Sequence, residues 1–177
     1  MSRQRLTALA LAAGLLVGGC GYSLSPSPYG LAEPLTVSVP VAGNQSRYAD
    51  LGPQLTAEVI GRLNSSPTIS VRENSASTLR LTIQQVVVSG GAWETRRTNN
   101  MPTHSASRVA VLVVEAVLER PNPAGGPPLA RRQVFASQRN FMVTNIAAHS
   151  ELQENEAFQW VITDLGQKIA QAMFSEF

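Results

Sequence analysis

Alternating apolar and polar residues predict a sheet of four strands. Residues 35–41 place leucine or valine at every second position, the pattern of a strand with one buried face. Three longer segments follow, near residues 79–88, 109–118 and 130–143. The alternation changes parity at Gln84–Gln85, which predicts a β-bulge there.

Apolar residues at helical spacing predict two helices. The first begins after Asp50, a suitable N-cap, and extends to about Leu63. The second carries an apolar stripe from Phe158 to the C-terminus, and Ser150 with Gln153 matches a capping box at its start. Ile69 and Val71 are compatible with a further short strand.

The remaining segments are predicted to connect these elements. Residues 43–46 form a turn, residues 90–107 a long polar loop, and residues 121–128 a turn rich in proline and glycine. A second parity change is expected at Val114–Glu115. The order of elements predicts an α+β fold: a two-layer sandwich with two helices packed on one face of a mainly antiparallel four-stranded sheet.

The N-terminus has the layout of a bacterial lipoprotein signal. Arg3 and Arg5 precede an apolar run, and Gly18–Gly19 come directly before Cys20, the only cysteine. We expect residues 1–19 to be removed, Cys20 to carry lipid, residues 20–34 to form a Pro/Ser tether, and residues 35–177 to form a single domain. The alternatives are an ordinary cleaved signal peptide or an uncleaved anchor.

Composition and charge exclude several functions. The first 19 residues hold two of the 14 basic residues and none of the 12 acidic ones, so the rest of the chain is formally neutral. No nucleic-acid motif is present, and one cysteine allows neither an intramolecular disulfide nor a cysteine-based metal site. His104 and His149 are the only histidines, and neither lies in a catalytic motif. We expect no enzyme activity, catalytic residue, cofactor or metal. The rival hypothesis of a degenerate hydrolase or carbohydrate-binding lipoprotein requires a pocket joining a histidine to a carboxylate.

Several motifs resemble the LptE family of lipopolysaccharide-assembly lipoproteins. Family members begin the mature chain with Cys-Gly-Tyr and a nearby hydrophobic residue, matched here by residues 20–24. A strand ending in a proline and a turn with an asparagine follow, matched by Pro40 and Asn44. A Leu-Thr pair in the next helix, Leu55–Thr56, and an amphipathic C-terminal helix complete the resemblance. The family often has an aromatic residue before the asparagine, where this chain has Ala42–Gly43.

The resemblance implies a role at the outer membrane. LptE-like proteins fill the lumen of LptD, a large outer-membrane β-barrel, help it to assemble and bind lipopolysaccharide. Gly21, in place of an aspartate, favours export of the lipidated protein to the outer membrane, facing the periplasm and the barrel lumen. The alternative is a periplasmic lipoprotein adaptor of a peptidoglycan synthase or a lipid transporter.

The resemblance also directs attention to cationic and aromatic side chains. Lipopolysaccharide carries phosphates and carboxylates, for which arginines are the natural contacts. The candidates are two pairs, one in the predicted long loop and one at the start of the next strand: Arg96, Arg97, Arg131 and Arg132. Trp93, beside Gly90–Gly91, is the candidate contact with the partner protein.

Overall fold

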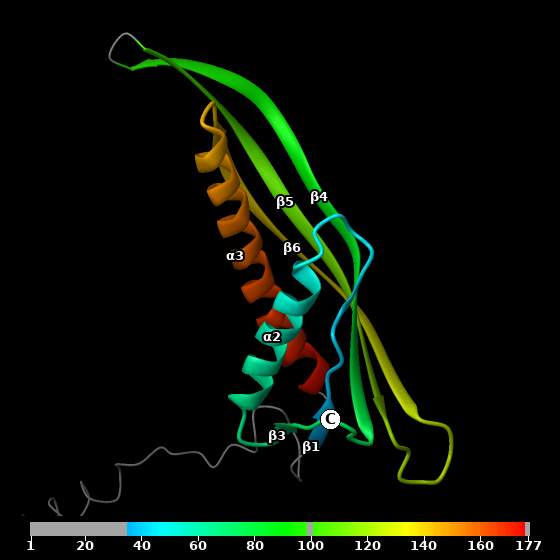
Figure 1. Cartoon of the computed structure of the whole chain (residues 1–177). Helices are drawn as coiled ribbons and strands as arrows, with labels where there is room; N and C mark the ends of the chain where they lie inside the picture. The colour runs from blue at the N-terminus through cyan, green and yellow to red at the C-terminus, as the bar shows by residue number, and fades with distance from the viewer. Residues whose placement is uncertain (1–34, 99–100, 176–177) are drawn as a thin grey trace, which may run out of the picture.

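The computed structural model describes residues 35–98 and 101–175, and these residues form two layers. One layer is a six-stranded sheet, and the other consists of two helices that lie on the same face of it (Figure 1). The α+β class and the placement of both helices on one face are as predicted. The strands are β1 (Leu35–Ser38), β2 (Gly43–Asn44), β3 (Ile69–Val71), β4 (Ser77–Thr98), β5 (Met101–Arg120) and β6 (Leu129–Thr144). The helices are α2 (Leu51–Asn64) and α3 (Ala147–Phe174).

The sheet is mixed, not the four-stranded, mainly antiparallel sheet that the sequence suggested. The strand order is β3-β1-β4-β5-β6, with β2 pairing to β4 beside this path. β4, β5 and β6 are antiparallel, whereas β1 is parallel to both β3 and β4, and β2 is parallel to β4. The parallel arrangement arises because α2 carries the chain back from the end of β1 to the start of β3.

The first predicted strand is shorter than its alternation indicated. β1 ends at Ser38, close to Pro40, which has no N–H group to donate to a neighbouring strand. Val41 was predicted to share the buried face of this strand, but its side chain is 68% exposed. Gly43 and Asn44, predicted to lie in a turn, form β2 by pairing with Thr82 and Ile83.

The segment predicted as a long loop is mostly strand. β4 and β5 continue as a paired hairpin as far as the pair Thr98 and Met101, well beyond the level where α3 begins (Figure 1). The sequence of its outer part has no regular alternation of apolar and polar residues, so the pattern gave no indication of these strands. Gly91 is required there, because a Cβ at this position would lie 2.7 Å from the carbonyl oxygen of Ser107.

One of the two predicted parity changes is confirmed. The register of β4 against β5 shifts between Ile83 and Gln85, as expected for a bulge at Gln84. The second prediction, at Val114–Glu115, is wrong, because β5 keeps its even-numbered residues buried from Ala110 to Leu118 and pairs with β6 there without a change of register. The bulge lies in β4 alone, opposite a regular partner strand.

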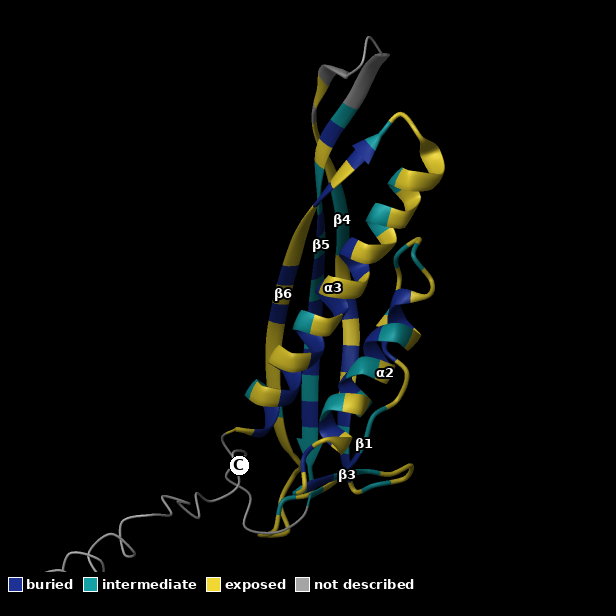
Figure 2. Cartoon of the chain, turned by 90° about the vertical axis from the view of Figure 1, so that its left-hand side faces the viewer, coloured by how far each residue is buried: buried dark blue, intermediate teal, exposed yellow. Residues whose placement is uncertain are grey.

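The core lies between the helices and the facing side chains of the sheet (Figure 2). The predicted apolar faces of both helices are buried: Leu55, Val59 and Leu63 in α2, and Leu165, Ile169 and Met173 in α3. α3 begins at Ala147, however, so the predicted capping box is wrong and Ser150 lies within the helix. The Ser150 hydroxyl instead accepts a hydrogen bond from the Thr144 N–H at 2.9 Å and ties the helix to the end of β6.

The Leu55–Thr56 pair has a clear structural role. The Thr56 hydroxyl accepts a hydrogen bond from the Ala42 N–H at 2.8 Å and donates one to the Gly52 carbonyl at 2.9 Å. Ala42 is 5% exposed, so its N–H has little access to water. The contact is close, because a Cβ at Gly52 would lie 2.8 Å from the Ala42 carbonyl oxygen. Thr56 therefore fixes the chain between β1 and β2 against α2.

Replacing Thr56 by valine is expected to lower the free energy of unfolding by about 1–3 kcal/mol, because it leaves the buried Ala42 N–H without its acceptor. Thr56→Ser keeps the hydroxyl and is the matched control. Urea unfolding of both variants measures the effect. Equal stability of the two variants would show that the hydroxyl is not needed.

Candidate functional site

The sheet face opposite the helices carries a stripe of valines that no described element covers (Figure 1). We call this surface the uncovered face; it is formed by the outward side chains of β4, β5 and β6. The register places Val111 between Val87 and Gln138, and Val113 between Gln85 and Ala136. Its apolar side chains are Val87, Val109, Val111, Val113, Val117, Val134 and Met142.

Exposure and charge vary across the uncovered face. Val134 is 54% exposed and Met142 is 48% exposed, whereas the valines of β5 are half-buried between their neighbouring strands. Ion pairs lie toward one end: Arg80 with Glu119 and Arg132 with Glu115, each at 3.2 Å. An apolar stripe beside charged residues is the arrangement expected of a surface that binds another macromolecule.

The four arginines predicted to bind ligand do not form one site. Arg96 and Arg97 lie in β4 near the hairpin tip, not in a loop, and their side chains are outside the described part of the structure. Arg97 pairs with Pro102, whereas Arg131 pairs with Leu118 far along the same strand β5. At the rise of a strand these positions are about 50 Å apart. Arg131 and Arg132 also point to opposite faces of the sheet, as neighbours in a strand do.

Trp93 lies in the projecting hairpin and is 56% exposed. It pairs with Ala106, immediately after a register irregularity between Gly90 and Trp93. That register places its side chain on the helix-side face of the sheet, so it does not belong to the uncovered face. Its predicted contact with a partner stays a prediction. Cys20 and the rest of residues 1–34 lie outside the described residues.

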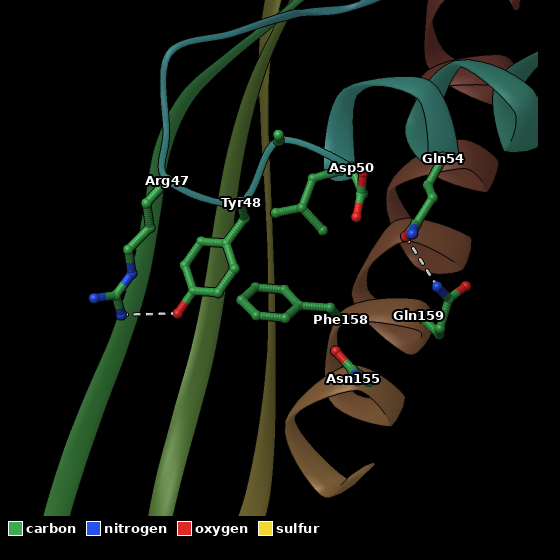
Figure 3. Close-up of a pocket in the computed structure, with 9 residues that line it drawn as sticks. Arg47, Tyr48, Asp50, Gln54, Asn155, Phe158 and Gln159 are labelled. Atoms are coloured by element: carbon green, nitrogen blue, oxygen red, sulfur yellow. Dashed lines mark hydrogen bonds between the residues drawn. The ribbon is translucent and has the colours of Figure 1, made fainter. Parts of the chain in front are cut away.

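Sequence reasoning missed a cavity of about 600 Å³ between the start of α2 and the middle of α3 (Figure 3). Tyr48 and Phe158 form its aromatic part, with ring centroids 4.9 Å apart. The side-chain amide of Gln159 donates a hydrogen bond from Nε2 to the side-chain oxygen Oε1 of Gln54 at 2.9 Å. The lining residues are Arg47, Tyr48, Ala49, Asp50, Leu51, Gln54, Asn155, Phe158 and Gln159.

The Tyr48 phenol links the two segments beside this cavity. It donates a hydrogen bond to Glu154 at 2.9 Å and accepts one from Arg47 at 2.9 Å. Burial raises the pKa of the phenol and the hydrogen bond to Glu154 raises it further, so Tyr48 remains a donor at neutral pH. His149 is exposed in the first turn of α3 and is not among the lining residues. The cavity therefore offers hydrogen bonds and an aromatic contact, without the histidine–carboxylate pair that the hydrolase hypothesis requires.

A second polar cluster joins α3 to β6. Asp164 accepts hydrogen bonds from the Ser137 hydroxyl and from Lys168 Nζ, both at 2.6 Å. Burial of Asp164 opposes its ionisation, but the hydrogen bonds from Lys168 and Ser137 outweigh it and hold the pKa of the carboxyl below its ordinary value.

This cluster predicts a contribution to acid stability. Because the pKa of Asp164 is lower in the folded chain, its stabilising effect is present above the ordinary value of 3.8 and is lost as the pH falls through the folded value. Asp164→Asn is therefore expected to reduce the loss of stability between about pH 6 and about pH 3, measured by urea unfolding. Asp50→Asn, at an N-cap whose side chain makes no capping hydrogen bond, is the control and should leave that loss unchanged. An unchanged acid response in Asp164→Asn contradicts the assignment.

The described residues show neither a metal site nor a membrane-crossing helix. No group of three or more histidine, cysteine, aspartate or glutamate side chains there is arranged to hold a metal ion. Neither α2 nor α3 has the length and hydropathy that a membrane-crossing helix needs.

Comparison with known proteins shows a shared fold. No family model matches the chain, and no curated protein matches it in sequence. A protein from Xanthomonas campestris of the DUF330 family is similar, with a TM-score of 0.52 and 10% identity over 80% of this chain and 86% of that chain. A provisionally named lipoprotein from Caulobacter crescentus CB15 has a TM-score of 0.50 and 10% identity over 78% and 87%. The rare lipoprotein B from Shewanella oneidensis is more distant, with a TM-score of 0.45 and 14% identity over 78% and 93%.

Proposed function

We propose that the chain is an outer-membrane lipoprotein of the LptE type, which fills and helps to assemble an LptD-like β-barrel and binds lipopolysaccharide. The observation that carries the proposal is the uncovered face, whose valines have no partner within the described chain. A barrel of that size is too wide for its own side chains to fill, so its lumen leaves room for a second protein, whose contact would cover the exposed valines.

Two further observations support the proposal. The Gly18–Gly19–Cys20 sequence after an apolar run supplies the lipid anchor, and Gly21–Tyr22 continues the family's mature N-terminus. The fold is shared with solved structures that include a provisionally named lipoprotein. The protein acts in this proposal through shape and contact, without a catalytic step.

Affinity purification tests the partner. The full-length protein, tagged at its C-terminus, is captured from detergent-solubilised outer membranes, and the co-purifying proteins are identified by mass spectrometry. We expect recovery of a large outer-membrane barrel in about equal amount. Recovery of a peptidoglycan synthase or a transporter component without a barrel would replace this proposal by the adaptor alternative.

Lipopolysaccharide binding is tested at the two arginine pairs separately. Each charge-assisted hydrogen bond to a phosphate contributes about 1.5–3 kcal/mol, so removing a pair that binds the ligand should weaken affinity at least about tenfold. The variants are Arg96→Ala with Arg97→Ala, and Arg131→Ala with Arg132→Ala, with lysine at the same positions as the controls. Because the two pairs are far apart along β5, we expect their effects to be independent. Unchanged affinity in both alanine variants would remove the arginines from the proposal.

A further inference from the structure

β6 is the last strand on its side of the sheet. It pairs with β5 along its whole length, from Leu129 opposite Arg120 to Thr144 opposite Ser105. No described strand pairs with its other edge, and β6 runs along the border of the sheet in Figure 2. A free edge of 16 residues is long, and such edges are sites where another strand can be added.

One contact shows which backbone groups of β6 point outward. Lys168 Nζ donates a hydrogen bond to the Ala136 carbonyl oxygen at 3.4 Å from α3, so that oxygen points away from β5. The N–H and C=O groups of every second residue of a strand point to the same edge. Val134, Gln138, Asn140 and Met142 therefore share the outward direction of Ala136, and the side chains of all five are exposed.

A groove between β6 and α3 lies beside this edge. Two cavities, of about 270 Å³ and 160 Å³, lie along it, and Trp160 lines both. Trp160 is 44% exposed, and the Arg139 guanidinium lies 4.9 Å from the centre of its ring. Ser137, Asp164 and Lys168 line the first cavity, and Arg139 and Glu156 line the second. An incoming segment would thus meet a backbone ladder, an aromatic ring and fixed charges.

The charges on β6 indicate what kind of strand can be added. The strand contains Arg131, Arg132 and Arg139 and no acidic residue. Antiparallel pairing of β6 with a second copy of itself would bring arginines together without a carboxylate on either strand, which is unfavourable. A strand with acidic side chains would instead place a carboxylate beside Arg139, a favourable cross-strand pair.

We propose that β6 binds an extended acidic segment of another protein by strand addition in this groove. The acidic side chains of the segment contact Arg139. Of the two carboxylates that line the groove, Asp164 is already paired with Lys168 and Glu156 is exposed to solvent. Its alternate side chains are apolar and lie beside Val134, Ala136 and Met142, which extends the uncovered face by one strand. A backbone N–H of the segment replaces Lys168 as the donor to the Ala136 carbonyl. The inference rests on the edge, the groove and the charges of β6, and holds whether or not the large partner is a barrel.

Peptide binding to the full-length lipidated protein in detergent micelles tests the proposal by fluorescence anisotropy. The probe is a labelled peptide of about eight residues with alternating glutamate and valine, a typical strand length. A peptide with lysine in place of glutamate tests the charge requirement. A third peptide, with an N-methyl group on every backbone nitrogen, has no N–H to donate and cannot form the ladder.

Two variants with matched controls localise the binding. Ala136→Pro removes one outward N–H and places a ring on the edge, while the pairing with β5 does not use that group. Ala136→Val keeps the N–H and is its control. Arg139→Glu reverses the charge beside the groove, and Arg139→Lys is its control. Circular dichroism and melting temperature check that each variant is folded.

We expect the acidic peptide to bind at least about tenfold more tightly than the lysine peptide and the N-methylated peptide. Ala136→Pro should bind the acidic peptide about tenfold more weakly than the wild type does, whereas Ala136→Val should bind it equally well. Arg139→Glu should prefer the lysine peptide. Equal binding of the N-methylated peptide, or no binding of any peptide, overturns the proposal. If Ala136→Pro does not fold, the comparison of the three peptides and the two Arg139 variants still test strand addition at β6. A wild-type dimer by sedimentation that Ala136→Pro converts to monomers would show that a second copy occupies the edge, and would also overturn it.

Discussion

Replacing Cys20 by serine is expected to release the protein from the membrane fraction. The thiol is the only one in the chain and the predicted attachment point for lipid, which a serine hydroxyl cannot replace. Each buried methylene of an acyl chain contributes about 0.8 kcal/mol, and two or more chains make attachment effectively permanent. Loss of all chains should therefore reduce the membrane-bound fraction at least about tenfold. Fractionation of cells, with metabolic labelling by a fatty acid, measures both consequences.

The control for this experiment keeps the thiol and changes a neighbouring polar residue, Ser23→Ala. It should be labelled and should remain in the membrane fraction. A Cys20→Ser protein that stays on the membrane, in particular at the size of the uncleaved chain, would instead support an uncleaved N-terminal anchor. Fatty-acid labelling of that variant would contradict Cys20 as the attachment site.

Val111→Asp is expected to abolish capture of the large partner. Val111 lies in the middle strand of the antiparallel part of the uncovered face, between Val87 and Gln138. A carboxylate buried in that contact without a compensating hydrogen bond or opposite charge should cost at least about 2 kcal/mol, or about thirtyfold in affinity. The amount of partner that co-purifies with the tagged chain measures the effect.

Val111→Leu is the matched control, because it keeps an apolar side chain of similar size at the same position. It should capture the partner as the wild type does. The melting temperatures of both variants separate loss of contact from loss of fold. A folded Val111→Asp protein that captures the wild-type amount of partner would exclude the uncovered face from the contact.

The helices and the central strands were predictable because their periodicity follows from local burial. The stripe from Phe158 to Met173 and the bulge at Gln84 are examples, since each depends on which neighbouring residues face the core. The start of α3 was missed because Ser150 also satisfies the pattern of a capping box, whereas its hydroxyl is used by Thr144.

Features that depend on distant parts of the chain were not predictable. The parallel pairing of β1 with β3 depends on where α2 returns the chain. The outer hairpin of β4 and β5 has no regular alternation of apolar residues in its sequence, so the pattern did not predict these strands. The outer hairpin changes the site, because Arg96 and Arg97, expected in a loop, lie on a strand and far from the second pair.

The candidate surfaces also depend mainly on contacts between distant parts of the chain. The cavity beside Tyr48 joins residues 110 positions apart, Tyr48 and Phe158, and neither lies in a motif that predicts their contact. The free edge of β6 follows from strand order, which the sequence pattern did not determine. Trp93 was proposed as a contact because its polar, glycine-rich neighbourhood indicated a loop, whereas it lies in β4.

Site-directed photocrosslinking in intact cells is the most direct test of the central claim, that the uncovered face meets an outer-membrane barrel. A photoreactive amino acid replaces Val111, cells are irradiated, and the adduct is identified by mass spectrometry, with unirradiated cells as the control. We expect an adduct with a large LptD-like barrel. An adduct with a peptidoglycan synthase or a lipid transporter, or a folded and membrane-bound protein that forms no adduct, would contradict it.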